Sequence, residues 1–298
     1  MTAHRDAPNG QRHRTAGNTG GDMSGGRDSE LRVALAQMDI ELGRWDVNVR
    51  RVARLFTQAE AARANLLVLP ELWSTGYDLE ECRAHARLSV EEVLPVLAAM
   101  AREHRMSVAG SLLVEDERGR VVNRALVLDE TGATLACYDK VHLFGPMGED
   151  EHLAPGNAMS VFQLSGIDTG LAICYDLRFP ELFRRYALDG AVLMLLMAEW
   201  PVARVSHWRT LVRARAIENQ CFVAACNRVG TARGTAFAGY SALVDPWGTV
   251  IAEGGEEETL VVGTLDIRAI QAARGKIHTL EDRRPDVYDS PPSMVQTP

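Results

Sequence analysis

The stretch GLAICYDLRFPEL (170–182) decides the fold class of this sequence. It begins as an apolar run of buried-strand length, and Pro180 then begins a helix, since the first helical turn needs no proline N–H. Cys174 stands at the strand end, where the backbone N–H groups that follow can donate to a developing oxyanion. The segment predicts an α/β protein with Cys174 as a candidate nucleophile. The alternative is a buried cysteine that acts only as a small apolar side chain, and position alone favours it.

Apolar runs alternate with amphipathic helical stretches on both sides of this segment. We expect strands at 32–40, 66–70, 107–115, 121–129, 134–140, 160–164, 169–175, 191–198 and 221–228, and a strand group within 241–265. We expect helices around Val49 to Ala59, around Val90 to Met100, at 180–188 and at about 204–219, then a short helix and an irregular tail from Arg283. No linker-like stretch interrupts residues 31–280, so we predict a single α/β domain over residues 31–289.

The two ends of the chain are predicted to stay outside this domain. Residues 1–30 contain six glycines and few bulky apolar side chains, so they cannot bury enough surface to offset the entropy of ordering. We therefore expect a disordered N-terminal tail at 1–30 and a flexible C-terminal tail at 290–298. Met23 is an alternative translation start that would remove most of the first tail.

Composition excludes several classes of partner. The 298 residues carry a formal net charge of −8, which disfavours nucleic acid and anionic membrane surfaces. No apolar run reaches the length of a membrane span. The five cysteines form an odd count without a secretory apolar segment, and Cys221 and Cys226 lack the partners of a zinc site. We predict reduced thiols, a cytoplasmic location and structural roles for the cysteines other than Cys174.

Two further strand ends carry residues of the kind that a cysteine hydrolase needs. Glu71 follows the apolar run LLVLP, where a partly desolvated carboxylate is suited to general-base chemistry. Its alternative is a helix N-terminal acid that interacts with the helix dipole. Lys140 ends the segment TLACYDK. Lysine and arginine together number 32 in this sequence, and the only two lysines are Lys140 and Lys276. A compact charge at Lys140 suits an oxyanion better than a planar guanidinium does, although a solvated surface lysine is the alternative.

Together these residues resemble the catalytic set of a known family. The segments LVLPELWSTGY (67–77), YDKVHLF (138–144) and GLAICYDLRFPEL resemble the three motif segments of the carbon–nitrogen hydrolases of the nitrilase superfamily. The resemblance covers roughly residues 31–289 and implies a four-layer α-β-β-α sandwich with Glu71, Lys140 and Cys174 as the catalytic set. It also implies a second glutamate before a Pro-Gly, which Glu149 matches and Glu151 matches less well.

The resemblance implies a hydrolase that works through a thioester. Glu71 would take the proton of Cys174, while Lys140 and the backbone N–H of Tyr175 would stabilise the oxyanion. No metal or organic cofactor is implied. Segments 198–230 and 281–288 look like those of omega-amidases, which release ammonia from ω-amido acids such as 2-oxoglutaramate.

The sequence leaves the substrate and the oligomeric state open. Arg178 and Arg204 are candidates to bind a substrate carboxylate, with helix capping or surface pairing as the alternative for Arg178. An N-carbamoyl amino-acid amidohydrolase, a nitrilase and a catalytically silent scaffold subunit are the alternative functions. The family resemblance also implies a homo-oligomer, and the helix at 204–219, with Trp208, Leu211 and Val212, is its candidate surface. Core packing is the alternative for that helix.

Overall fold

A computed structural model of the chain describes residues 30–159 and 161–288. The tails predicted at 1–30 and 290–298 lie outside the described residues, apart from Glu30. The helices and strands follow the sequence pattern closely: β3 (Ser107–Glu115) and α5 (Pro180–Leu188) have the predicted bounds. The predicted tail from Arg283 is wrong in one respect, because it contains a short helix, α8 (Pro285–Tyr288).

The first of two large sheets has six strands in the order β14-β1-β2-β3-β4-β5. β1, β2 and β3 run parallel, while β14, β4 and β5 are added by antiparallel pairing. The bounds are β1 (Glu30–Gln37), β2 (Leu66–Val68), β3, β4 (Val121–Leu128), β5 (Thr134–Asp139) and β14 (Thr259–Asp266). The turns Asp116–Arg120 and Asp129–Ala133 close the two hairpins, and they contain Gly119 and Gly132.

The second large sheet repeats this plan in the order β13-β12-β9-β8-β7-β6. Its middle strands β7, β8 and β9 run parallel, and the outer strands pair antiparallel. The bounds are β6 (Phe162–Leu164), β7 (Ile167–Ile173), β8 (Leu193–Ala198), β9 (Phe222–Asn227), β12 (Ala242–Val244) and β13 (Val250–Glu253). A small hairpin of β10 (Thr231–Ala232) and β11 (Thr235–Ala236) stands apart from both sheets.

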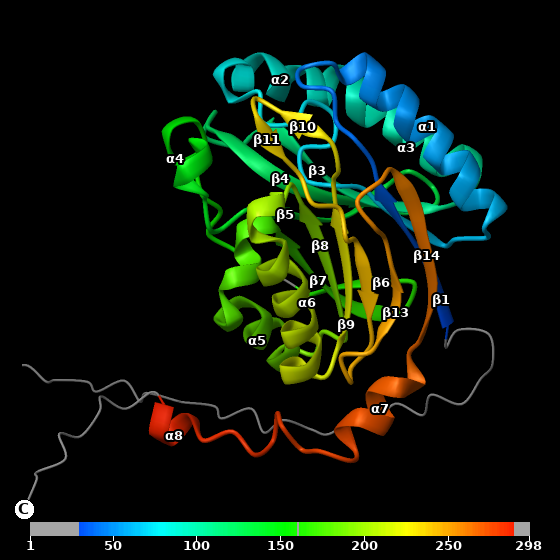
Figure 1. The fold of residues 1–298 in the computed structure, drawn as a ribbon, viewed down its shortest axis with the longest axis vertical. Coiled ribbons are helices and arrows are strands. Elements are labelled where there is room, and N and C mark those ends of the chain that lie inside the picture. Colours follow the sequence, from blue (N-terminus) through cyan, green and yellow to red (C-terminus); the bar gives the residue numbers. More distant parts are fainter. Residues whose placement is uncertain (1–29, 160, 289–298) are drawn as a thin grey trace, which may run out of the picture.

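Helices cover the outer face of each sheet (Figure 1). α1 (Trp45–Ala61) and α3 (Leu94–His104) pack Phe56 and Leu97 into a buried cluster with Leu67 and Val108 of the first sheet. α5 and α6 (Val205–Asn219) pack against the second sheet, while another buried cluster contains apolar residues of both sheets. The layers are therefore α-β-β-α, as predicted. The remaining helices are α2 (Cys82–Leu88), joined to α3 by a π-helical turn, α4 (Glu149–His152) and α7 (Arg268–Arg274).

Two predictions about side-chain exposure are wrong. Trp208 and Val212 of α6 are buried in the core shared with the second sheet, so the side chains named for self-association are largely not available to a partner. Their apolar character reflects core packing. Cys137 is exposed on β5 rather than buried, because β5 is the outermost strand of the first sheet.

The topology brings several loops to one edge of the sandwich. β5 runs in the same direction as β2, because two antiparallel pairings separate it from the parallel strand β3. The carboxyl ends of β2 and β5 therefore meet at one edge, and the carboxyl ends of β7 and β8 meet at one edge of the second sheet. The segments after these four strands carry Glu71, Lys140, Cys174 and Glu199. Within the described residues, no helix is long and apolar enough to cross a membrane.

Candidate active site

Glu71 lies two residues beyond Leu69 and is completely buried. Its Oε1 is within 2.8 Å of Lys140 Nζ, 2.8 Å of the Tyr77 hydroxyl and 2.9 Å of Asn123 Nδ2. Its Oε2 accepts the backbone N–H of Glu199 at 3.0 Å. These donors suit an ionised carboxylate, and Oε2 keeps room for one more proton.

Lys140 directly follows β5 and is also completely buried. Its Nζ contacts Glu71 Oε1 at 2.8 Å and Glu149 Oε1 at 2.7 Å, with the Tyr77 hydroxyl at 3.3 Å. Although burial alone would lower the pKa of this ammonium, the charges of Glu149 and Glu71 outweigh it and raise the pKa. Lys140 is therefore a fixed cation, and the alternative of a surface lysine is wrong.

Glu149 is the first residue of α4 and is buried, whereas Glu151 is exposed. Its Oε2 accepts the backbone N–H of Phe144 at 2.6 Å, and its Oε1 lies 2.8 Å from the Tyr77 hydroxyl. Burial raises the pKa of Glu149, the Lys140 charge lowers it, and the Glu71 charge raises it, so the net direction is upward. The structure thus brings Glu149, and not Glu151, to Lys140.

Cys174 begins a turn of 3-10 helix (Cys174–Arg178) between β7 and α5. Its backbone φ of 44° is in the left-handed region, which a non-glycine residue occupies only where the surroundings hold it. The sulfur is 3.9 Å from the Glu199 carbonyl oxygen, and the residue is buried rather than exposed above the sheet edge. Burial and the charges of Glu71 and Glu149 raise the thiol pKa, against the Lys140 charge. The resting group is therefore a thiol that needs a base.

Asp176 ties the turn of Cys174 to the strand end of Lys140. This buried carboxylate accepts the Tyr138 hydroxyl at 2.8 Å, the Ile173 backbone N–H at 2.9 Å and both the backbone N–H and the ring Nδ1 of His142, at 3.1 and 2.7 Å. Tyr138 and His142 lie on either side of Lys140 in the sequence. Because Asp176 holds both segments, it fixes the distance between the two sheets at the site.

Glu199 connects the same elements through its backbone. Its N–H holds Glu71 Oε2, and its carbonyl oxygen faces the Cys174 sulfur. Its side chain pairs with the fully buried Arg228 at 2.8 Å, while its Oε1 has no hydrogen-bond partner. Burial raises the pKa of Glu199 to about 7, even though Arg228 opposes the shift.

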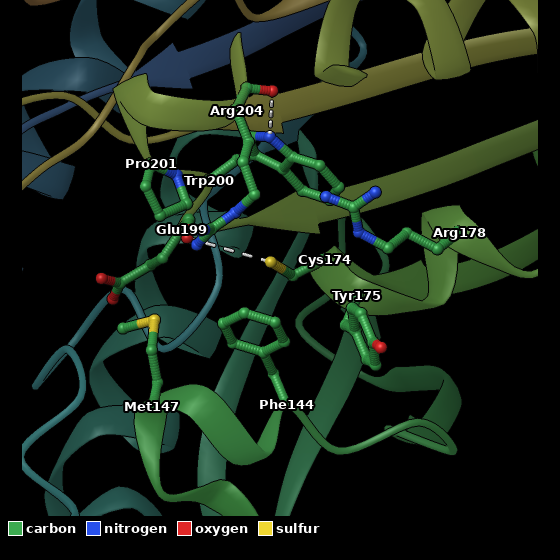
Figure 2. Close-up of a pocket in the computed structure, with 9 residues that line it drawn as sticks. All are labelled: Phe144, Met147, Cys174, Tyr175, Arg178, Glu199, Trp200, Pro201 and Arg204. Carbon is green, nitrogen blue, oxygen red and sulfur yellow. Dashed lines mark hydrogen bonds between the residues drawn. The ribbon is translucent and has the colours of Figure 1, made fainter. Parts of the chain in front are cut away.

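A pocket opens directly at Cys174 (Figure 2). Its other lining residues are Phe144, Met147, Tyr175, Arg178, Glu199, Trp200, Pro201 and Arg204. In Figure 2, Phe144 and Tyr175 lie on one side of the sulfur, and the guanidinium groups of Arg178 and Arg204 on the other. The pocket therefore combines aromatic walls with two cations.

The two arginines are held by rings rather than by acids. The Arg178 guanidinium lies 4.8 Å from the Trp200 ring centre, with an Nη2 contact to His207 at 3.3 Å, and the Arg204 guanidinium lies 5.4 Å from the Phe144 ring centre. Within residues 30–159 and 161–288, neither forms an ion pair with a carboxylate. The described residues also contain no cluster of His, Cys, Asp and Glu that could hold a metal ion.

Fold and site together define a class, the α/β enzymes that cleave carbon–nitrogen bonds with a buried cysteine. The chain belongs to the carbon-nitrogen hydrolase family, whose model matches residues 32–275. It is 40% identical to the 2-oxoglutaramate amidase of Bacillus subtilis, over 86% of this chain and 98% of that protein. It is 31% identical to the omega-amidase NIT2 of Mus musculus, over 87% of this chain and 97% of that protein.

Solved structures give the same family. A mutant of the amidase from Nesterenkonia sp. AN1, with the acetamide moiety of fluoroacetamide added covalently at its active-site cysteine, is 30% identical with a TM-score of 0.79, covering 88% of this chain and 97% of that one. Saccharomyces cerevisiae Nit3, a member of the nitrilase superfamily, is 28% identical with a TM-score of 0.78, covering 84% and 94%. The predicted family, fold and amide-hydrolase activity are confirmed.

Several residues of the site were not singled out from the sequence. Tyr77 lies six residues after Glu71, and Asp176 lies two residues after Cys174, both inside the motif segments. Their closeness to the predicted catalytic residues is the sequence signal that points to them. Asn123 and Arg228 carry no comparable signal, because each lies on or beside an ordinary strand far in sequence from Glu71.

Proposed function

We propose that this hydrolase releases ammonia from the terminal amide of a short ω-amido acid such as 2-oxoglutaramate. The observation that carries the proposal is the pair of guanidinium groups in the pocket of Cys174, Arg178 and Arg204, which have no carboxylate partner among the residues that the structure describes. A carboxylate is the group that such cations bind best. The two relatives named 2-oxoglutaramate amidase, at 40% and 37% identity, support the same substrate class.

The reaction starts with proton transfer from Cys174 to Glu71. Oε2 of Glu71 receives the proton, since Oε1 already faces three donors. The sulfur attacks the amide carbon, and the oxyanion is stabilised by the Tyr175 backbone N–H and by the third N–H of Lys140. That third N–H is free to turn because its contact with Tyr77, at 3.3 Å, is the longest of the three. The other two N–H groups of Lys140 stay on Glu71 Oε1 and Glu149 Oε1.

Collapse of the tetrahedral intermediate breaks the carbon–nitrogen bond. Glu71 returns its proton to the departing nitrogen, so ammonia leaves and a thioester remains on Cys174. A water molecule then gives a proton to Glu71 and attacks the thioester. The carboxylic acid product leaves, and the proton on Glu71 returns to the sulfur, which restores the thiol. The buried ion pair of Lys140 and Glu71 performs both halves of the reaction.

A panel of four compounds tests this proposal. 2-Oxoglutaramate, succinamate, a carbamoyl amino acid and a nitrile are incubated with the protein, and ammonia is measured. We expect release from the two ω-amido acids, without carbon dioxide, and none from Cys174→Ala, while Cys137→Ala keeps the full rate because Cys137 is an exposed cysteine. Carbon dioxide with the ammonia would favour the carbamoyl alternative, and turnover of only the nitrile would favour a nitrilase. Ammonia release by Cys174→Ala would contradict the mechanism.

Location, assembly and domain limits complete the proposal. A cytoplasmic enzyme fits the five cysteines, which are unpaired in the part of the chain that the structure describes. A homo-oligomer and a single domain over residues 31–289 are proposed from the family resemblance. Because Trp208 and Val212 are buried, an oligomer would have to form through other side chains.

A further inference from the structure

Tyr77 forms a bridge between the two buried glutamates. Its hydroxyl oxygen is 2.8 Å from Glu71 Oε1 and 2.8 Å from Glu149 Oε1. Two oxygens at this distance need a proton between them, because otherwise their lone pairs repel. A tyrosine hydroxyl supplies only one proton, so one of the two carboxyl groups must supply the second.

The other contacts decide which carboxyl group holds that proton. Glu71 Oε1 already faces Lys140 Nζ and Asn123 Nδ2, so its lone pairs are occupied. Glu149 Oε1 faces, apart from Tyr77, only the Lys140 ammonium, and its Oε2 accepts the Phe144 N–H. A protonated Glu149 Oε1 donates to Tyr77 and still accepts from Lys140, whereas a protonated Glu71 Oε1 would be overcrowded.

We propose that the resting enzyme holds Glu149 as a neutral acid that donates to Tyr77, while Tyr77 donates to the ionised Glu71. This inference rests on the proposed roles of Glu71 and Cys174, but not on the identity of the substrate. It assigns Tyr77 as a positioning residue that acts through the two glutamates. The upward pKa direction of Glu149, caused by burial and by Glu71 against Lys140, agrees with this arrangement.

The charge balance explains what the shared proton does. With Glu149 neutral, Lys140 and Glu71 cancel, and the buried site has no net charge. After the thiol proton moves to Glu71, Lys140 cancels the Cys174 thiolate, so the site is still neutral. With Glu149 ionised, both states would carry one excess negative charge, and the charge would oppose the thiolate. Tyr77 and Glu149 therefore make the thiolate easier to form.

Infrared spectroscopy without substrate tests the position of the proton. We expect the wild-type protein at pH 7 to show a carboxylic-acid C=O stretching band that is clearly weaker in Glu149→Gln, where the partly protonated Glu199 still contributes, and that is lost in the double variant Glu149→Gln/Glu199→Gln. The band should persist in Asp150→Asn, a variant of the exposed neighbour, and in Glu199→Gln, which removes the other buried glutamate of raised pKa. Equal acid-band intensity in Glu149→Gln and wild type would overturn the proposal.

Thiol alkylation tests the role of Tyr77. We expect Tyr77→Phe to react with iodoacetamide at Cys174 at least about tenfold more slowly than wild type, which equals one pKa unit of thiolate formation. Tyr186→Phe is the matched control and should keep the wild-type rate. Tyr186 is also a buried tyrosine, but its hydroxyl has no hydrogen bond to Glu71, Lys140, Glu149 or Cys174. A wild-type rate in a folded Tyr77→Phe would overturn the proposal. Both readouts are independent of turnover, so they can hold even if the proposed substrate is wrong.

Discussion

The two sheets contribute different chemistry to the site. The first sheet supplies the buried charged and polar groups to which we assign proton transfer and charge stabilisation, with Glu71 after β2, Asn123 on β4 and Lys140 after β5. The second sheet supplies the proposed nucleophile, Cys174, after β7 and, in the loops that follow β7 and β8, the two pocket arginines. Neither sheet holds a complete set, so the reaction depends on how the two sheets pack against each other.

Direct hydrogen bonds cross between the sheets at the site. The Glu199 N–H reaches Glu71 across 128 positions of sequence, and Asp176 holds Tyr138 and His142. Because the contacts of Glu199 with Glu71 and of Tyr138 with Asp176 are buried, the low local dielectric strengthens them. The residues that connect the two sheets therefore set the geometry of the site together with the reacting residues.

The largest effect is expected for the connection at Asp176. The carboxylate of Asp176 accepts four hydrogen bonds. In Asp176→Asn one carboxylate oxygen becomes an amide NH2 group, which faces a donor instead of accepting from it. We expect a loss of about 2 to 3 kcal/mol in the free energy of unfolding, since buried donors lose their acceptor. Activity should fall as well, because Cys174 and Lys140 are no longer held together. Urea unfolding and ammonia release measure the two effects.

Tyr138→Phe shows how much of the effect of Asp176→Asn comes from a single hydrogen bond. It removes one of the four donors and should cost about 1 kcal/mol. Asp150→Asn, on the exposed side of α4, should change neither quantity. If Asp176→Asn unfolds at the wild-type urea concentration, the two sheets do not depend on this contact.

A smaller effect is expected for recognition by the second sheet. Arg204→Ala removes a guanidinium that lies over Phe144 in the pocket. We expect KM for an acidic ω-amide to rise about 10- to 30-fold with little change in kcat, because a charge-assisted contact contributes about 1.5 to 2 kcal/mol. KM for a neutral amide should hardly change. Arg209→Ala, whose arginine pairs with Glu253 on the surface, is the control. Equal changes in KM for acidic and neutral amides would contradict the assignment.

The sequence predicted the architecture well because strand and helix periods are local properties. The three motif segments also placed Glu71, Lys140 and Cys174 at strand ends. The shared direction of β2 and β5 brings Glu71 and Lys140 to one edge of the first sheet, and the packing of the two sheets adds Cys174. Burial was harder to foresee. Trp208 and Val212 look like an apolar surface in sequence, and only the second sheet shows that they face the core.

The contacts between the loops at the strand ends could not be predicted from local pattern. Glu199 in AEWP and Arg228 in CNRVG are far apart in sequence, and either could be a surface charge. Their pairing depends on the loops after β8 and β9 meeting in three dimensions. Tyr77 is an intermediate case. It lies in the motif segment that carries Glu71, but the local pattern assigns no role to its hydroxyl.

A last effect concerns the pH dependence that Glu199 adds where the sheets meet. An unfolded glutamate ionises near pH 4.3, whereas burial raises the pKa of folded Glu199 to about 7. Between these values the folded protein keeps a proton that the unfolded chain has lost, so rising pH lowers the free energy of unfolding. Glu199→Gln removes this dependence. We therefore expect the Tm of wild type, relative to that of Glu199→Gln, to fall as pH rises from 4.5 to 7 and then to level off. A constant difference across this range would mean that Arg228 keeps Glu199 ionised, and that Glu199 does not titrate between pH 4.5 and 7.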